Sequence, residues 1–202
     1  RNGEPVKAPV EVKASRDSST APTVKVELPK NSGDTKVEIP VSNVKPGTVA
    51  VLVHPDGTEE IVKNSLPTED GIQLTVNGGA TVKIVDNSKG FIDTQDHWAK
   101  DAIDFVSARG LVNGMSATIY APDASTTRAQ MVTMLWRAMG QPAAASGASF
   151  ADVPADSYYA QAVAWAIENG ITAGVGGGRF DPNSTCTRAQ IVTFLYRSYQ
   201  SK

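Results

Sequence analysis

The sequence predicts an α+β protein of two parts: a small antiparallel β-sandwich-like domain, followed by all-α helix-loop-helix repeats. Three observations lead to this prediction. Apolar and polar residues alternate between about residues 23 and 88, as they do in half-buried strands. After residue 91, apolar residues recur at three- and four-residue spacing, as on one face of a helix. Much of this second part also occurs twice, sixty residues apart.

Composition excludes several classes of protein. The chain has 202 residues, is 41% hydrophobic and carries a formal charge of -2, which is typical of a folded domain and offers no basic stripe for nucleic acid. Its apolar runs are too short for membrane insertion. The single Cys186 allows no internal disulfide. Because Arg1 is not preceded by a leader, we expect a mature or excised fragment, with any signal peptide upstream.

The first ninety residues are expected to form a linker and a β module. Residues 1–22 are rich in Lys, Glu, Pro, Ser and Thr, so they should be a disordered linker. Residues 23–89 should form the β module, with about six strands. Two turns, at residues 54–58 and 77–79, contain the glycines that hairpins favour, so both are predicted to be hairpins.

The repeats occupy the second half of the chain. The first copy spans residues 90–140 and the second spans residues 150–202, joined by a connector of small residues at 141–149. The match between the copies runs without a gap from Trp98 and Tyr158 to Arg137 and Arg197. Each copy should contain two helices. Neither pair can bury its apolar face alone, so we expect the copies to pack on each other.

Helix ends are predicted from matching residues in the two copies. Each first helix should be capped by an aspartate and end at a glycine: Asp96 and Gly110 in one copy, Asp156 and Gly170 in the other. Each second helix should begin with a capping box, because Thr-Arg-Ala-Gln occurs at residues 127–130 and again at 187–190.

These residues resemble the S-layer homology motif. Each copy opens with Phe-x-Asp, places an aromatic residue at the start of the first helix, passes through a glycine-containing loop to an aromatic residue and proline, and starts the second helix with Thr-Arg-Ala. The resemblance implies a non-catalytic, extracellular anchor that binds the secondary cell-wall polysaccharide, often pyruvylated, of Gram-positive bacteria. It also implies that three motifs form a prism with ligand grooves between neighbours.

The sequence departs from that pattern at two points. Gln130 and Gln190 replace the family's usual glutamate, which keeps the capping box and removes a charge. Two motifs are present where three are usual, so a third could have been excised, could come from another chain by self-association, or its slot could be closed by the β module. That module is similar to short β modules of surface proteins from Gram-positive gut anaerobes, and we interpret it as a spacer.

The resemblance assigns ligand binding first to the arginines of the Thr-Arg-Ala elements, Arg128 and Arg188. An arginine in the first turn of a helix opposes the helix dipole and so favours an anionic partner, and its planar guanidinium suits a carboxylate. Backbone N–H groups at the same helix start could add to the anion site. The secondary candidates are Asp93, Asp152, Trp98, Tyr158, Gly114 and Gly174.

Structural roles remain open for the same residues. The arginines could instead pair with Asp93 or Asp152 to join the motifs. Trp98 and Tyr158 could be core aromatics that fix the helix starts, or flat surfaces for a sugar. Gly114 and Gly174 could be turn formers.

No catalytic motif accompanies these residues. The sequence contains no nucleophile elbow, phosphate loop or zinc spacing, so we expect no enzyme activity, no cofactor and no metal. Two other functions remain open. The chain could be a structural or protein-interaction module of an S-layer or adhesin, or it could be the anchoring tail of a larger secreted enzyme.

Overall fold

The structure is a computed structural model that describes residues 10–13, 23–147 and 149–200. It divides the chain into two compact units, Arg1–Asn87 and Ser88–Lys202, where the sequence prediction put the boundary after residue 89. Within the predicted linker, Val10–Lys13 forms a strand, β1. The rest of that prediction lies outside the described residues.

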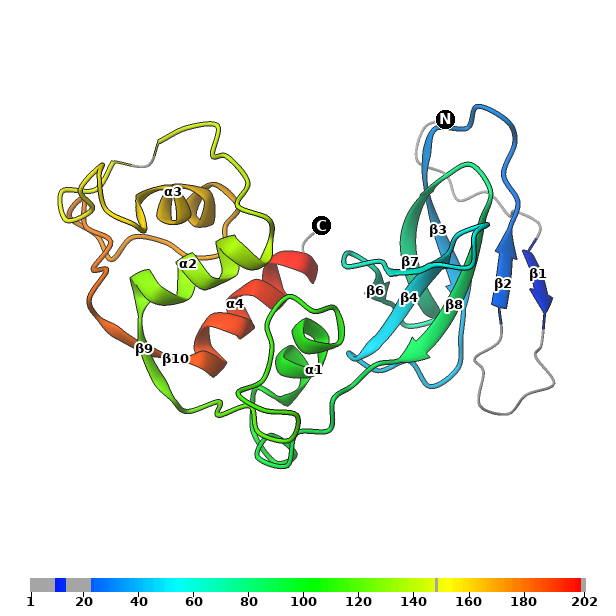
Figure 1. Cartoon of the computed structure of the whole chain (residues 1–202), viewed down its shortest axis with the longest axis horizontal. Helices are drawn as coiled ribbons and strands as arrows, with labels where there is room; N and C mark the ends of the chain where they lie inside the picture. Colours follow the sequence, from blue (N-terminus) through cyan, green and yellow to red (C-terminus); the bar gives the residue numbers. More distant parts are fainter. Residues whose placement is uncertain (1–9, 14–22, 148, 201–202) are drawn as a thin grey trace. The chain divides into compact units, whose positions relative to one another are not determined.

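The first unit contains two antiparallel sheets (Figure 1). The larger sheet has the order β1-β2-β8-β4-β5 and the smaller has the order β3-β7-β6. The remaining strand bounds are Thr23–Val26 for β2, Asp34–Pro40 for β3, Thr48–Val53 for β4, Glu59–Ile61 for β5, Leu66–Pro67 for β6, Gly71–Asn77 for β7 and Ala80–Asp86 for β8.

The two sheets share one hydrophobic core, to which alternating residues of their strands contribute. The turn at residues 54–58 is the predicted hairpin, because β4 pairs with β5. The prediction of a second hairpin at residues 77–79 is wrong. β7 and β8 belong to different sheets, so this turn carries the chain from one sheet to the other. The core residues are Val24, Val26, Ile39, Ala50, Ile72, Leu74, Val76 and Val82.

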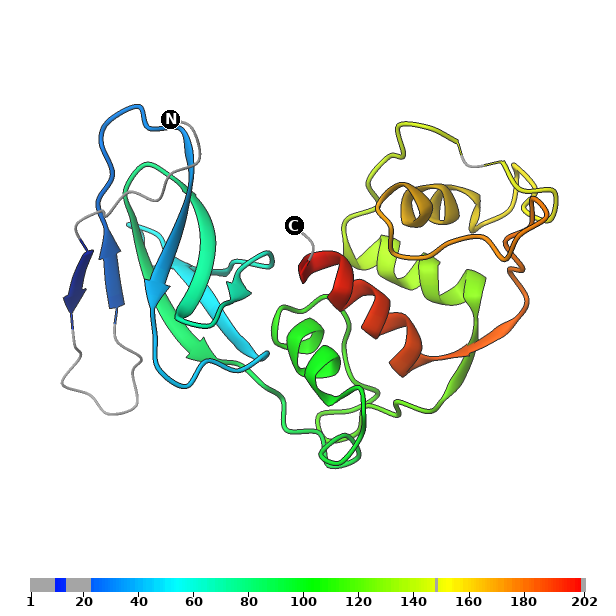
Figure 2. The ribbon, with the colours of Figure 1, turned by 180° about the vertical axis from the view of Figure 1, so that it is seen from behind.

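The second unit contains four helices and a small sheet (Figure 2). The prediction of all-α repeats is wrong, because β9 and β10 pair as an antiparallel sheet between the copies. The N-cap Thr127 has an extended backbone, with φ −78° and ψ 152°, so the strand runs directly into the cap. The elements are α1 (Lys100–Ala108), β9 (Ser125–Thr127), α2 (Arg128–Ala138), α3 (Ala160–Glu168), β10 (Thr185–Thr187) and α4 (Arg188–Gln200).

The predicted N-caps are confirmed for the second helix of each copy and are wrong for the first helix. The Thr127 hydroxyl accepts from Gln130 N–H while the Gln130 side chain accepts from Thr127 N–H, and Thr187 and Gln190 make the same two bonds. Asp96 and Asp156 cap nothing, since α1 and α3 begin four residues later without a side-chain cap.

The first helices end at the predicted glycines. Gly110 has φ 68° and Gly170 has φ 66°, a left-handed conformation that glycine adopts without strain. Leu111 N–H then donates to Val106 C=O, and Ile171 N–H donates to Ala166 C=O. Such bonds close the last turn of a helix.

Thr127→Ala and Thr187→Ala should each lower the free energy of unfolding by about 1 kcal/mol, because each removes the acceptor for an N–H group in the first helical turn. Urea denaturation followed by circular dichroism would measure the change. Ser146→Ala, in the exposed connector, is the control and should have no effect. Equal stabilities for all three variants would contradict a contribution from the capping boxes.

Candidate ligand-binding site between the repeats

The two repeats are related by a pseudo-twofold axis through β9 and β10. Thr127 pairs with Thr185, Thr126 with Cys186, and Ser125 with Thr187, so exchanging the copies leaves the register unchanged. The helices are exchanged as well, because α1 packs on α4 and α2 packs on α3. The copies therefore bury each other's apolar faces, as the sequence predicts.

Arg128 reaches from the start of α2 into the loop of the second repeat. Its Nε donates to Phe180 C=O at 3.1 Å, and its Nη2 donates to Ala173 C=O at 2.8 Å. The guanidinium carbon lies 4.5 Å from the centre of the Phe180 ring, within cation–π range. Thr172 Oγ1 lies 3.4 Å from Nη2.

Arg188 makes the reciprocal set of contacts with the first repeat. Its Nε donates to Tyr120 C=O at 3.1 Å, its Nη2 donates to Asn113 C=O at 2.9 Å, and its guanidinium carbon lies 4.5 Å from the centre of the Tyr120 ring. Neither arginine is within ion-pair distance of Asp93 or Asp152 in the described part of the chain. The arginines do join the repeats, but through carbonyl groups and aromatic rings and not through aspartates.

The backbone at the two helix starts is also occupied. Arg128 N–H donates to Ser184 C=O and Ala129 N–H donates to Pro182 C=O, at 2.9 and 3.0 Å. Matching bonds start α4. The expectation that these N–H groups add to an anion site is therefore wrong, because the opposite repeat already uses them.

Asp93 and Asp152 hold the loops that the arginines contact. The Asp93 carboxylate accepts from Tyr120 N–H at 3.0 Å and from Ala121 N–H at 2.8 Å. Burial opposes the ionisation of Asp93, but these N–H groups outweigh it and lower its pKa. Ala121 has φ 58°, an unusual conformation for a residue other than glycine, which the carboxylate stabilises.

Asp152 has the same role in the second repeat. It accepts from Phe180 N–H at 2.9 Å and from Asp181 N–H at 2.8 Å. The bond from Phe180 is the main cause of a lowered pKa for Asp152. Asp181, like Ala121, is left-handed, with φ 61°. Both carboxylates are thus engaged by their own loops.

Gly114 and Gly174 permit a close approach by the aromatic residue that opens each repeat. A Cβ on Gly114 would lie 2.5 Å from the Phe91 ring, and a Cβ on Gly174 would lie 2.8 Å from the Phe150 ring. Neither glycine has a positive φ, so packing, and not turn geometry, requires glycine here. The sequence analysis did not identify the structural role of Phe91 and Phe150, although their position at the start of each repeat could have indicated it.

Trp98 and Tyr158 are exposed, so the interpretation of these residues as core aromatics is wrong. Trp98 is 65% exposed and Tyr158 is 60% exposed. Beside Trp98, His97 is held from both sides: Ala99 N–H donates to its Nδ1 at 3.0 Å, so Nε2 donates to Asp123 Oδ1 at 2.9 Å. Because Trp98 and Tyr158 occupy equivalent positions, each repeat exposes one aromatic side chain to solvent there.

In the part of the chain that the structure describes, other reactive groups do not form a second site. Cys186 is half-buried in β10, and burial raises its pKa, which disfavours the reactive thiolate. Within the described ranges, no three metal-ligating side chains come together.

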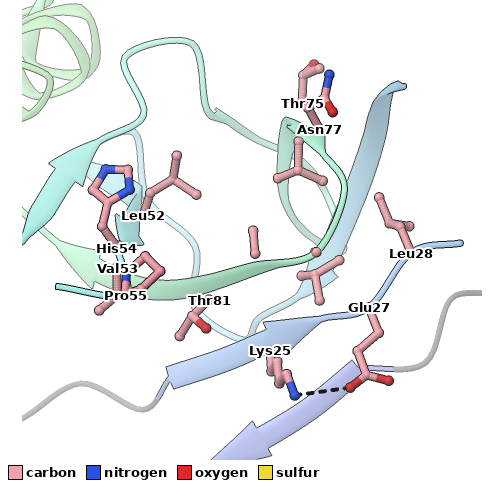
Figure 3. Close-up of a pocket in the computed structure, with 14 residues that line it drawn as sticks. Lys25, Glu27, Leu28, Leu52, Val53, His54, Pro55, Thr75, Asn77 and Thr81 are labelled. Carbon is pink, nitrogen blue, oxygen red and sulfur yellow. Dashed lines mark ion pairs between the residues drawn. The ribbon is translucent and has the colours of Figure 1, made fainter. Parts of the chain in front are cut away.

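An open pocket of about 950 Å³ lies in the β unit (Figure 3). Leu28 and Leu52 contribute apolar walls, and His54 and Thr81 contribute polar groups. Two charged residues, Lys25 and Glu27, also line it and form an ion pair with each other at 3.2 Å. No candidate site residue lines it.

The geometry defines a class: a module of two interlocked helix-loop-helix repeats with exposed aromatic residues and inter-repeat arginines. The S-layer homology domain model matches residues 90–132 and 149–192, so this part of the chain belongs to the S-layer homology family. Domains of this family mediate cell-wall anchoring and are not themselves catalytic. The chain is accordingly assigned to the bacterial cell surface. None of the described helices has the length and apolar character needed to cross a membrane.

Several curated proteins are similar over this region. The chain is 31% identical to Exoglucanase XynX of Acetivibrio thermocellus over 68% of its own length and 12% of that protein. It is 34% identical to an amylopullulanase of Thermoanaerobacterium thermosulfurigenes over 55% of the chain and 6% of that protein. It is 30% identical to the surface-layer 125 kDa protein of Lysinibacillus sphaericus over 51% and 9%. The chain thus spans only a small part of these relatives.

Tyr120 distinguishes the two otherwise equivalent junctions. Its hydroxyl is buried and has no hydrogen-bond partner among the described residues, whereas the second repeat has Phe180 at this position. Burial raises the pKa of Tyr120 to about 12, which keeps the hydroxyl protonated. Leaving a buried polar group unsatisfied costs about 1–3 kcal/mol.

Tyr120→Phe should therefore stabilise the protein, by about 1 kcal/mol or more, since it removes the hydroxyl and keeps the ring beneath Arg188. Differential scanning calorimetry would register this as a higher Tm. The reverse change in the other repeat, Phe180→Tyr, should be destabilising. A Tyr120→Phe variant with a lower Tm would mean that the hydroxyl is satisfied.

Asp93→Asn and Asp152→Asn should each lower the free energy of unfolding at pH 7. The folded-state pKa of each carboxyl is lowered, so its contribution is present above the unfolded pKa of about 3.9 and is lost as the pH falls through the folded value. The difference in the free energy of unfolding between each variant and the wild type should therefore be smaller at pH 3 than at pH 7, as measured by urea denaturation. Asp96→Asn, on the surface, is the control. A difference that grows towards low pH would refute this role.

Proposed function

We propose that this chain is a non-catalytic anchor that attaches a surface protein to a secondary cell-wall polysaccharide without a covalent bond. The observation that carries this proposal is the exposure of Trp98 and Tyr158 at equivalent positions, while other aromatic residues of the repeats, such as Phe91, Tyr120 and Phe180, are buried. An exposed aromatic face suits the apolar face of a sugar.

The arginines support the finer proposal of an anionic, pyruvylated polymer. A guanidinium binds a carboxylate in a planar, charge-assisted way. Because Arg128 and Arg188 already donate to carbonyl groups of the opposite repeat, a ligand would bind beside an arginine that the fold has oriented beforehand. Asp93, Asp152, Gly114 and Gly174 then act on the ligand indirectly, by shaping the loops.

Two repeats are sufficient for this proposal. Arg128 and Arg188 each contact the other repeat, so neither junction needs a motif from elsewhere. This reciprocity favours a unit that works as a monomer over one that requires a third motif or self-association.

The attached protein could be an enzyme. The names of the similar exoglucanase and amylopullulanase, of which this chain matches only a small part, support an anchoring segment of a larger secreted enzyme. The similar surface-layer protein supports a structural protein instead.

Co-sedimentation with purified Gram-positive cell walls would test the proposal. The protein should pellet with intact walls and remain soluble after chemical removal of the secondary polymer. Combined Trp98→Ala and Tyr158→Ala should weaken retention by roughly tenfold or more, since stacking on one ring contributes on the order of 1 kcal/mol.

The matched control for this experiment is the double variant Met134→Ala with Phe194→Ala. These side chains are also apolar, exposed and sixty residues apart, but they lie on α2 and α4. Equal retention of both double variants would exclude the aromatic surfaces as the binding site. Binding to walls without the polymer would exclude the polysaccharide as the ligand.

A further inference from the structure

The loop of the first repeat contains an asparagine followed by a glycine, Asn113 and Gly114, where the second repeat has Ala173 and Gly174. Asparagine is chemically labile, most of all before glycine, because glycine has no side chain to hinder its own backbone nitrogen. Two more such pairs, at residues 77–78 and 169–170, lie in the part of the chain that the structure describes. The three pairs can therefore be compared.

The pair in the first repeat has both of its reacting groups free. The Asn113 side chain is exposed and makes no hydrogen bond to any described residue. Gly114 N–H, the group next to it in the chain, also has no acceptor within the described ranges. No bond must therefore be broken before the Gly114 nitrogen approaches the Asn113 side chain.

The other two pairs are held by hydrogen bonds. Asn77 Nδ2 donates to Asp34 Oδ1 at 2.9 Å. Asn169 Nδ2 donates to Trp165 C=O at 2.8 Å. In that last pair the glycine is engaged as well, because its N–H donates to the carbonyl of residue 167 at 3.1 Å. Both asparagines are thus restrained where Asn113 is not.

Arg188 also acts on the peptide group that joins Asn113 to Gly114. Its Nη2 donates to Asn113 C=O at 2.9 Å, and the arginine is only 7% exposed. Loss of the Gly114 amide proton places negative charge on this carbonyl oxygen, and an oriented, charge-assisted donor stabilises such a charge. The guanidinium therefore makes the Gly114 nitrogen a better nucleophile. Among the described residues, neither of the other pairs has an arginine at its peptide carbonyl.

We propose that Asn113 is a site of spontaneous deamidation, activated by Arg188. Gly114 N attacks Asn113 Cγ and closes a five-membered imide, while the side-chain nitrogen leaves as ammonia and takes the amide proton with it. Water then opens the imide. Attack at Cγ gives aspartate, and attack at the former backbone carbonyl, which Arg188 polarises, gives isoaspartate. The chain loses one ammonia and gains one water, whatever ligand it binds.

The isoaspartate product does not fit the loop. The chain then runs through Cγ of residue 113, which adds one carbon to the backbone. Gly114 has no room for such a shift, because even a Cβ on it would lie 2.5 Å from the Phe91 ring and 2.7 Å from Ser116 C=O. The carbonyl that accepts from Arg188 also becomes part of a free carboxylate, so the peptide group that the arginine holds no longer exists. The first repeat should therefore be loosened.

Peptide mapping of the whole chain after incubation in mildly alkaline buffer would test the site. The three pairs fall in different tryptic peptides, and Asn113 is the only asparagine of residues 110–128. A pair at residues 2–3, outside the described residues, falls in a fourth peptide. Mass spectrometry should find Asn113 converted severalfold faster than Asn77 and Asn169, with isoaspartate as the main product. Equal rates, or a slower rate at Asn113, would overturn the proposal.

The variant Ala173→Asn tests the role of the arginine. In the second repeat, Arg128 Nη2 donates to Ala173 C=O at 2.8 Å and Gly174 follows, so this substitution supplies only the missing side-chain amide. Position 173 should then deamidate about as fast as Asn113. A rate as slow as that of Asn169, which fragmentation of the same tryptic peptide measures alongside, would contradict activation by the inter-repeat arginine.

Calorimetry of the incubated protein tests the structural consequence. Isoaspartate at residue 113 should lower the Tm by roughly 5 °C or more. Asn113→Ala, which copies the second repeat and keeps the carbonyl for Arg188, is the matched control and should keep its Tm after the same incubation. Fresh Asn113→Asp, which imitates the other product, should unfold like the wild type. An unchanged Tm once isoaspartate has formed, or an equal loss in Asn113→Ala, would overturn the loosening.

Discussion

The helical unit depends on an arginine that donates to backbone carbonyls of the other repeat, an interaction made once in each direction. Arg128 and Arg188 each bridge two carbonyl groups and lie over an aromatic ring. Charge-assisted bonds of this kind contribute about 1.5–3 kcal/mol each, and here they also satisfy carbonyls in loops that have no sheet to pair with. Each arginine thereby connects the start of a second helix to the loop of the other repeat.

The aspartates stabilise the loops that the arginines contact. Each carboxylate accepts two successive N–H groups and so fixes a left-handed residue, Ala121 or Asp181. The carbonyls that receive the arginines, at Tyr120 and Phe180, are adjacent to these left-handed residues. Carboxylate and guanidinium therefore act on opposite sides of one peptide segment without touching each other. This arrangement explains why both residue types recur in each repeat although they form no ion pair with each other.

Much of the helical unit could be predicted from its own repetition. The capping boxes and glycine stops are local signals, and the structure reproduces them. The partners of the arginines could not be predicted, because they depend on how segments 45 to 75 residues apart in the sequence meet. The same limit explains β9 and β10, since three-residue strands such as Ser125–Thr127 exist only by pairing with each other. In the β unit, a glycine turn at residues 77–79 has the composition of a hairpin and yet joins two sheets, which only the packing of the sheets decides. Whether Trp98 is exposed could not be predicted for a similar reason, because its burial depends on neighbouring residues whose positions the sequence alone does not give.

The exchange of helices between repeats has a consequence for how the protein is made. α1 packs on α4, and the ring centres of Phe105 and Tyr196 lie 4.8 Å apart. The helix that begins at Lys100 therefore packs on a helix that begins only at Arg188. On the ribosome, the first repeat therefore emerges without its partner and cannot reach its native packing until nearly the whole second repeat has been synthesised. A truncated chain with a single repeat would expose the apolar surface of its helices. Folding of one repeat thus depends on the presence of the other, because each supplies the helix on which the other packs.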